Sequence, residues 1–87
     1  MKIKWLVDCQ LEMVTAFDEK NEETTTEDVF PKAGEIEDVD PIAYHKSDDI
    51  DGSLETVALE YAHGCIYGIP CSLFEILEGR EEMEACN

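Results

Sequence analysis

Apolar side chains recur at every second position in the first part of the chain. The alternating positions are Ile3, Trp5, Val7, Cys9, Leu11, Met13, Thr15 and Phe17. A two-residue period places side chains on one face of an extended strand. Because a run of about fifteen residues is long for one strand, we expect a bend, bulge or hairpin between Asp8 and Gln10.

The pattern stops at residue 18. From Asp18 to Asp28 the chain has no apolar residue and no periodicity, so we expect a long, solvated and mobile acidic loop. A turn should follow at residues 29–34, because Pro31 fixes φ and Gly34 can adopt the positive φ that other residues avoid.

Alternation returns in the second half of the chain. The further strands that we expect cover residues 35–44, 55–61, 65–69 and 74–77. The expected connections are a turn cluster at 47–53, a tight hairpin link at 62–64 and one turn of 3-10 helix at 70–73. Pro41 has no amide donor, so we place it at a sheet edge or a bulge.

These elements predict a mainly all-β fold. Five or six short antiparallel strands, a long acidic loop and a 3-10 turn before the last strand are typical of a sheet curled into a small barrel. We expect one domain over residues 1–78 and a charged C-terminal tail over 79–87. The alternative is an α+β fold with a C-terminal helix.

Charge narrows the classes of partner. The 87 residues carry 22 acidic and 6 basic side chains, a formal net charge of −16. Such a chain repels itself, so salt should stabilise the fold. Binding to nucleic acid or anionic lipid depends on Lys and Arg, so we expect no direct contact with nucleic acid and none with a membrane. A basic protein or a cation is the electrostatic match.

The N-terminal apolar run is too short for a signal peptide or a membrane span, which predicts a cytoplasmic protein. The four cysteines, Cys9, Cys65, Cys71 and Cys86, are then expected to be free thiols.

Two stretches resemble SH3 domains. The first is Ala16-Phe17-Asp18, followed after the acidic segment by residues 27–36, Glu-Asp-Val-Phe-Pro-Lys-Ala-Gly-Glu-Ile. These are similar to the family's Ala-Leu-Tyr-Asp opening and its Glu-Leu-x-Phe-x-x-Gly-Asp motif. The second is residues 68–74, Gly-Ile-Pro-Cys-Ser-Leu-Phe, which resembles Gly-x-Ile-Pro-x-Asn-Tyr-Val. The chain also resembles uncharacterised small barrel proteins of phages and mobile genetic elements.

The resemblance implies an SH3-like barrel whose RT loop is the acidic segment. It also implies that Phe17 and Pro70 stand where SH3 domains hold proline-rich helices between aromatic side chains. Leu73 occupies the site of the last tyrosine, and the third-strand tryptophan is absent. These differences argue against binding of proline-rich peptides.

The candidate partner-binding residues combine the acidic loop with aromatic and proline positions beside turns. They are Phe17, Asp18, Glu19, Glu22, Glu23, Tyr44, Tyr67 and Pro70. Tyr44 and Tyr67 are the aromatic residues that we expect to be exposed, whereas core packing is the expected role of most others.

The sequence offers little support for a metal site or for a catalytic nucleophile. The weak candidates for a zinc site are the soft ligands Cys9, His63, Cys65 and Cys71. Because the sequence has no Cys-x-x-Cys pair, we expect buried thiols, no metal and no cofactor. Nothing in the sequence distinguishes a nucleophile with a base or a pair of carboxylates, so we do not expect an enzyme.

The functional prediction is therefore a non-enzymatic protein-interaction or regulatory module, with exposed strand edges that favour a homodimer. One alternative is an inhibitor that mimics DNA, because residues 18–40 hold ten acidic and two basic side chains. The other alternative is a metal or redox role through the Cys and His residues.

Overall fold

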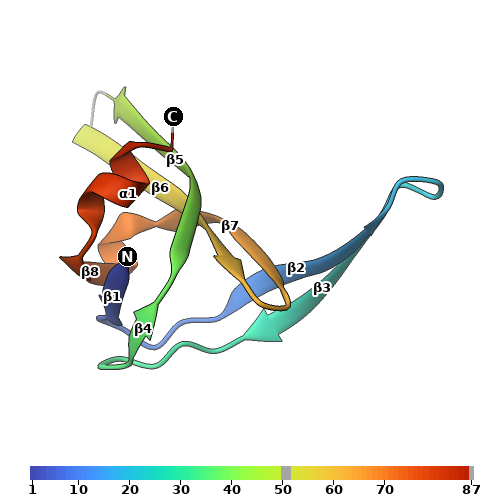
Figure 1. The fold of residues 1–87 in the computed structure, drawn as a ribbon, viewed down its shortest axis with the longest axis horizontal. Helices are drawn as coiled ribbons and strands as arrows, with labels where there is room; N and C mark the ends of the chain where they lie inside the picture. Colours follow the sequence, from blue (N-terminus) through green and yellow to red (C-terminus); the bar gives the residue numbers. More distant parts are fainter. Residues whose placement is uncertain (50–51, 87) are drawn as a thin grey trace.

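The computed structural model describes residues 1–49 and 52–86, and the side chains of these residues except 48, 49, 52 and 53. The elements in chain order are β1 (Lys2–Trp5), β2 (Leu11–Asp18), β3 (Glu23–Val29), β4 (Ile36–Asp38), β5 (Asp40–Asp49), β6 (Gly52–Tyr61), β7 (Gly64–Pro70), η1 (Cys71–Leu73), β8 (Phe74–Glu78) and α1 (Arg80–Glu84) (Figure 1). All paired strands are antiparallel. The prediction of a mainly β protein is confirmed.

The strands form two open sheets. The three-stranded sheet has the order β4-β1-β8, and the five-stranded sheet has the order β3-β2-β7-β6-β5. Only Val39 separates β4 from β5, so this nearly continuous strand passes from one sheet to the other. The Val39 N–H donates to the Met1 carbonyl oxygen at 2.8 Å. Among the described strands there is no closed barrel, and eight strands replace the expected five or six.

The core lies between the sheets and takes its side chains from both. The fully buried ones are Trp5, Ile3, Leu59, Ile69, Met83 and Val57. The rings of Trp5 and Phe74 meet edge to face, with centroids 5.6 Å apart and an interplanar angle of 77°. Alternation places Ile3 and Trp5 inside. In β6, Val57, Ala58 and Leu59 are all buried, because the pairing of β6 with β7 shifts register between Val57 and Leu59.

The C-terminal segment adds a short helix to this core. Gly79 precedes α1 with φ of 87°, and Met83 in α1 is fully buried. The five-residue helix leaves the fold mainly β. Within residues 1–49 and 52–86, no helix is long and apolar enough to cross a membrane.

The largest departure from the sequence-based expectation is at residues 18–28. They do not form one long loop, because β2 continues to Asp18, the turn is confined to residues 19–22, and β3 begins at Glu23. Three consecutive threonines, at positions 24–26, favour extended backbone. Both faces of this part of β3 are exposed, so the strand carries no apolar alternation by which it could be recognised.

Several local expectations are confirmed. The first apolar run breaks between Trp5 and Leu11, and a register shift in the pairing of β5 with β6 falls between Pro41 and Ala43 on an edge strand. The tight link at 62–64 and the 3-10 turn before the last strand are also present. The expected strand at 35–44 is two strands, and the turn expected at 47–53 lies in part outside the described residues.

Candidate functional site

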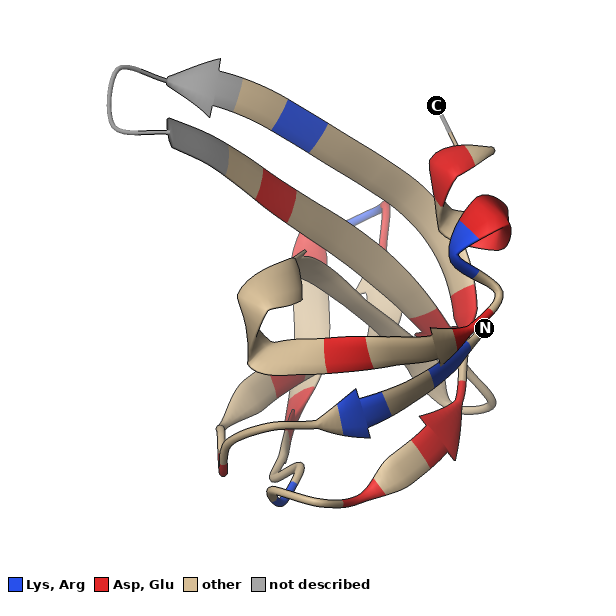
Figure 2. Ribbon diagram, turned by 90° about the vertical axis from the view of Figure 1, so that its left-hand side faces the viewer, with Lys and Arg blue, Asp and Glu red and all other residues tan. Residues whose placement is uncertain are grey.

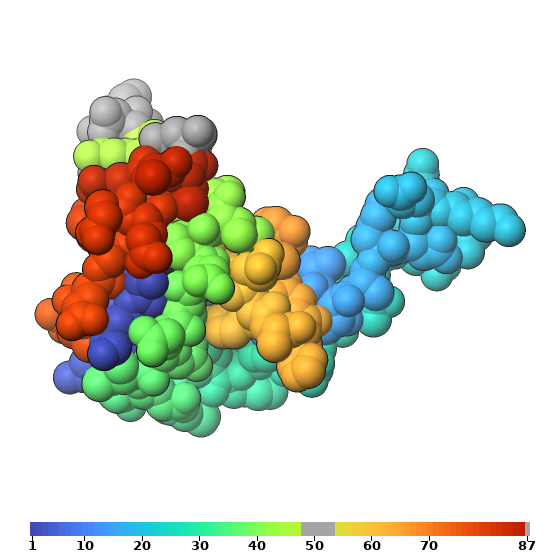
Figure 3. Space-filling model, viewed as in Figure 1, coloured from blue at the N-terminus to red at the C-terminus, as the bar shows by residue number. Residues whose placement is uncertain are grey.

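The outer end of the β2–β3 hairpin holds five of the predicted partner-binding residues. We name residues 17–23 the hairpin tip. Its predicted members are Phe17, Asp18, Glu19, Glu22 and Glu23, and all of them are exposed. The tip projects from the rest of the molecule, as Figures 1 and 3 show. The structure thus brings this group together on one protruding element.

Local hydrogen bonds define the turn of the tip. The Asp18 carboxylate accepts from the Lys20 amide at 3.0 Å and from the Asn21 side-chain amide at 2.9 Å. Glu22 adopts a left-handed conformation with φ of 54°, which returns the chain to β3. Phe17 pairs with Thr24 across the hairpin, and its side chain is 59% exposed. An aromatic ring therefore stands beside four carboxylates without core contacts.

Tyr44 and Tyr67 are brought together elsewhere, on the sheet formed by β5, β6 and β7. They line a shallow hollow of about 180 Å³, together with Val57 and Gly68. Tyr67 is 60% exposed, as expected, whereas Tyr44 is half-buried against the core. Burial and a hydrogen bond to Glu55 raise the pKa of the Tyr44 hydroxyl.

Pro70 ends β7, opposite Thr56, and is half-buried. The hairpin tip points away from this end of β7 (Figure 1). Phe17 and Pro70 therefore do not share one surface, although the SH3 resemblance aligns both with one peptide-binding site.

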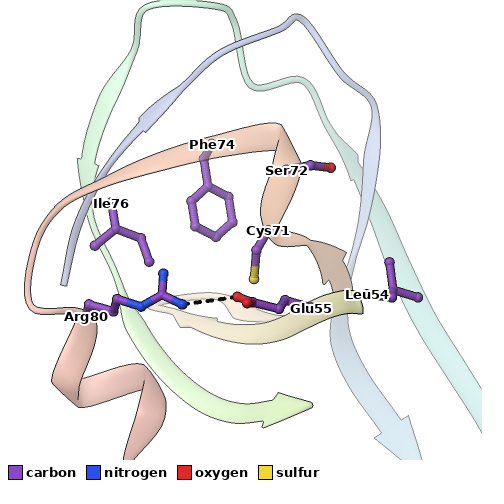
Figure 4. A pocket seen from close by; sticks show the side chains of 7 residues that line it. All are labelled: Leu54, Glu55, Cys71, Ser72, Phe74, Ile76 and Arg80. Atoms are coloured by element: carbon purple, nitrogen blue, oxygen red, sulfur yellow. Dashed lines mark hydrogen bonds and ion pairs between the residues drawn. The ribbon is translucent and has the colours of Figure 1, made fainter. Parts of the chain in front are cut away.

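A cavity that the sequence did not suggest lies between η1, β6, β8 and α1. Its volume is about 360 Å³, and its lining includes Leu54, Glu55, Cys71, Phe74, Ile76 and Arg80 (Figure 4). The Arg80 Nη2 donates to Glu55 Oε2 at 3.2 Å, and Lys46 Nζ lies 3.9 Å from Glu55 Oε1. These residues come from separate segments, and no spacing along the chain links them.

The four candidate metal ligands do not assemble. Cys9 lies in the β1–β2 connection, His63 in the β6–β7 turn, Cys65 in β7 and Cys71 in η1. The described part of the chain has no group of three or more His, Cys, Asp or Glu residues placed to hold a metal ion.

The surroundings of Cys9 and Cys71 raise the pKa of both thiols, which favours the protonated form. Burial, and then the charge of Asp8, raise the pKa of Cys9. Burial and the charge of Glu55 raise the pKa of Cys71, against the opposing effect of Arg80. Since the thiolate is the nucleophile, neither thiol is activated for attack.

Charged side chains are distributed differently in the three-stranded sheet and in the β2–β3 hairpin. The basic strand β1 carries Lys2 and Lys4 and lies between β4 and β8, which both bear acidic residues (Figure 2). In the segment 18–40 every acidic side chain is exposed except that of Glu37, which is half-buried. Opposite charges therefore face each other in the three-stranded sheet, whereas the hairpin is acidic.

Searches of protein-family models, curated proteins and solved structures find no match to this chain.

Proposed function

We propose that this chain is a non-enzymatic protein-interaction module with an SH3-like arrangement of strands, and that it binds a basic protein. The strand pairing supports the SH3-like arrangement: β1 pairs with both β4 and β8, β4 continues almost directly into β5, and η1 precedes β8. The acidic β2–β3 hairpin stands where the resemblance places the RT loop.

The observation that carries the proposal is the hairpin tip. It extends from the molecule without burying a side chain, and it presents Phe17 beside four carboxylates with one nearby cation, Lys20. Carboxylates attract and orient a basic partner, while an exposed aromatic ring supplies apolar contact area. A protruding ribbon of this composition suits contact with another protein better than it suits the interior of this one.

The raised pKa values of cysteine and tyrosine side chains support a non-catalytic role. General acids, bases and nucleophiles work best when their pKa values lie close to the working pH. The pKa values of Cys9, Cys71 and the three tyrosines are all raised, away from neutrality.

Capture of a partner from the cells that make the protein tests the proposal. The tip variant is Phe17→Ser with Glu19→Gln and Glu22→Gln. The control makes comparable changes elsewhere, Leu77→Ser with Glu75→Gln and Glu81→Gln, which likewise remove one exposed apolar side chain and two exposed carboxylates. After nuclease treatment, we expect wild type and control to retain the same partner by mass spectrometry and the tip variant to lose it. Equal retention by all three proteins would remove the tip from the proposal.

A DNA-mimicking inhibitor is the second candidate, favoured by the exposed carboxylates of the segment 18–40. It predicts that the captured partner binds DNA and that duplex DNA displaces the protein at low salt. A partner that binds DNA and this protein simultaneously would exclude mimicry and leave the interaction module in place.

A further inference from the structure

The outer edge of β3 is an unused pairing surface. β3 is the end strand of the five-stranded sheet and pairs only with β2 among the described strands. Its residues from Glu23 to Asp28 are all exposed, so no described segment covers them. A free strand edge presents backbone N–H and C=O groups on which an extended peptide can form another strand.

A pocket of about 260 Å³ lies at the end of this strand. We name it the Phe30 pocket. Its apolar lining includes Met13 and Ile66, together with Val29 and Phe30, which are the last residue of β3 and the next residue of the chain. Phe30 is 57% exposed at the pocket, while Met13 and Ile66 are buried beneath it. One aliphatic side chain of a peptide could occupy this space.

Carboxylates surround the apolar lining. Glu35 and Glu37 also line the Phe30 pocket, and the Tyr61 hydroxyl donates to Glu37 Oε2 at 3.1 Å, which fixes one of these carboxylates. Glu27 pairs directly with Met13, and paired residues project from the same face of an antiparallel sheet. None of the residues that line the pocket is basic.

The carboxylates on β3 and around the Phe30 pocket indicate which kind of strand can pair with this edge. Pairing of β3 with β3 of a second copy would bring Glu23, Glu27 and Asp28 of both strands together, and facing like charges destabilise a sheet. A segment with Lys or Arg next to an aliphatic residue would instead face opposite charges on the edge and around the pocket.

We propose that an extended basic segment of the partner protein adds as a strand to the edge of β3 and inserts one aliphatic side chain into the Phe30 pocket. This inference rests on the proposed protein-binding function and specifies the kind of segment that is bound. Backbone hydrogen bonds to β3 supply affinity, while the pocket and the carboxylates select the sequence.

The first test uses a fluorescent peptide, Lys-Thr-Lys-Thr-Leu-Thr-Lys-Thr-Lys, and fluorescence anisotropy with the full chain. Phe30→Ser should weaken binding roughly tenfold, as removal of an aromatic contact in an interface does. Leu77→Ser in β8 is the control, since Leu77 is also exposed and lies in the other sheet, outside both the hairpin tip and the pocket. It should leave binding unchanged, and equal effects of the two substitutions would overturn the pocket as the docking site. Urea unfolding of both variants verifies that they fold.

The second test examines strand addition through the peptide backbone. In a strand, alternate amides face the neighbouring strand. Peptides N-methylated at only the odd or only the even positions should therefore differ, with one series binding like the parent and the other losing roughly tenfold or more in affinity. Equal affinity of the two series would overturn strand addition.

Further peptides separate the contributions of side chains. Replacing the central Leu by Gly should weaken binding to wild type and have little effect on the Phe30→Ser variant, while replacing every Lys by Glu should abolish binding. A chain that dimerises through β3 and does not bind the parent peptide would overturn the proposal in favour of a second copy as occupant.

The proposed function and this inference fail separately. Loss of cellular capture by the tip variant without binding of the peptide would contradict only the edge of β3 and the Phe30 pocket. Peptide binding that depends on Phe30, together with cellular capture that does not depend on the tip, would contradict only the proposed role of the tip.

Discussion

The body of the molecule and the outer part of its β2–β3 hairpin differ in the burial of their side chains. We name residues 16–26 the outer hairpin and the rest of the described chain the body. In the body, the buried residues of β1, β6, β7 and β8 leave at most 4% of their surface exposed. From residue 16 to residue 28 every side chain is exposed. Both regions are β structure, but only the body gains stability from apolar burial.

Buried contacts in the body hold the fold together, whereas the exposed outer hairpin is available to a partner. The hairpin joins the body where β2 pairs with β7, at Val14 opposite Cys65. Beyond that joint it is a two-stranded ribbon, which has little stability of its own. Substitutions of buried residues in the body should therefore change stability, whereas substitutions in the outer hairpin should have little effect on it.

The largest expected effect is in the centre of the body. Leu59 is fully buried, so Leu59→Ala should lower the free energy of unfolding by about 2–5 kcal/mol. Phe17→Ala in the hairpin should change it by no more than about 0.5 kcal/mol. Urea unfolding followed by the fluorescence of buried Trp5 measures both. Similar losses in the two variants would remove the distinction between the regions.

A smaller effect is expected at the joint. A Cβ at Gly64 would overlap the Val14 carbonyl oxygen and lie 2.9 Å from Met13 Cγ, so Gly64→Ala forces β2 away from β7. We expect a loss of about 1–3 kcal/mol, the cost of overpacking. His63→Ala, at the exposed neighbouring position, is the control. Unchanged stability of the Gly64 variant would show that β2 and β7 can move apart at the joint without loss of stability.

The next effect is the pH dependence of the body. Burial, then the charge of Glu37 and the hydrogen bond to it, raise the pKa of Tyr61 in the folded state. A raised folded-state pKa gives stability that is complete below the unfolded pKa, near 10, and is lost as pH rises from there toward the folded value.

Tyr61→Phe should therefore flatten the decline of stability above about pH 10. At neutral pH it should cost about 1 kcal/mol through the lost hydrogen bond. Urea unfolding over a pH series measures both effects. A decline as steep as that of wild type would assign the pH dependence to other groups.

The smallest change in stability is expected when the outer hairpin is removed. Ala16 pairs with Thr25, so Asn-Gly can replace residues 17–24 as a two-residue turn. The free energy of unfolding should change by about 0.5 kcal/mol or less, because no buried side chain is lost. Stability should also depend less on salt, since the deletion removes self-repelling charge. Unfolding of the shortened chain at low denaturant would make the hairpin part of the folding unit.

The same contrast explains which parts of the fold could be predicted from the sequence. Alternation identified the strands whose inner face is buried, such as those that contain Trp5 and Leu59. It missed β3, because a ribbon exposed on both faces has no reason to alternate, and strand propensity alone was the remaining signal in the three threonines. The core position of Met83 was equally hidden in a segment dominated by charge.

The candidate sites divide in the same way. The hairpin tip could be predicted because its residues are contiguous, and the structure keeps them together. The Phe30 pocket and the cavity around Glu55 and Arg80 could not, because each is assembled from several segments that only the sheet pairing brings together. The shared hollow of Tyr44 and Tyr67 likewise depends on the pairing through β6.

Native-state hydrogen exchange tests most directly whether the outer hairpin and the body are separate in stability. We expect amides of residues 16–26 to exchange through local openings that cost far less than global unfolding, and the amides of Leu59 and Ile66 to exchange only when the whole molecule unfolds. Equal protection in both regions, lost together as denaturant is added, would contradict the account.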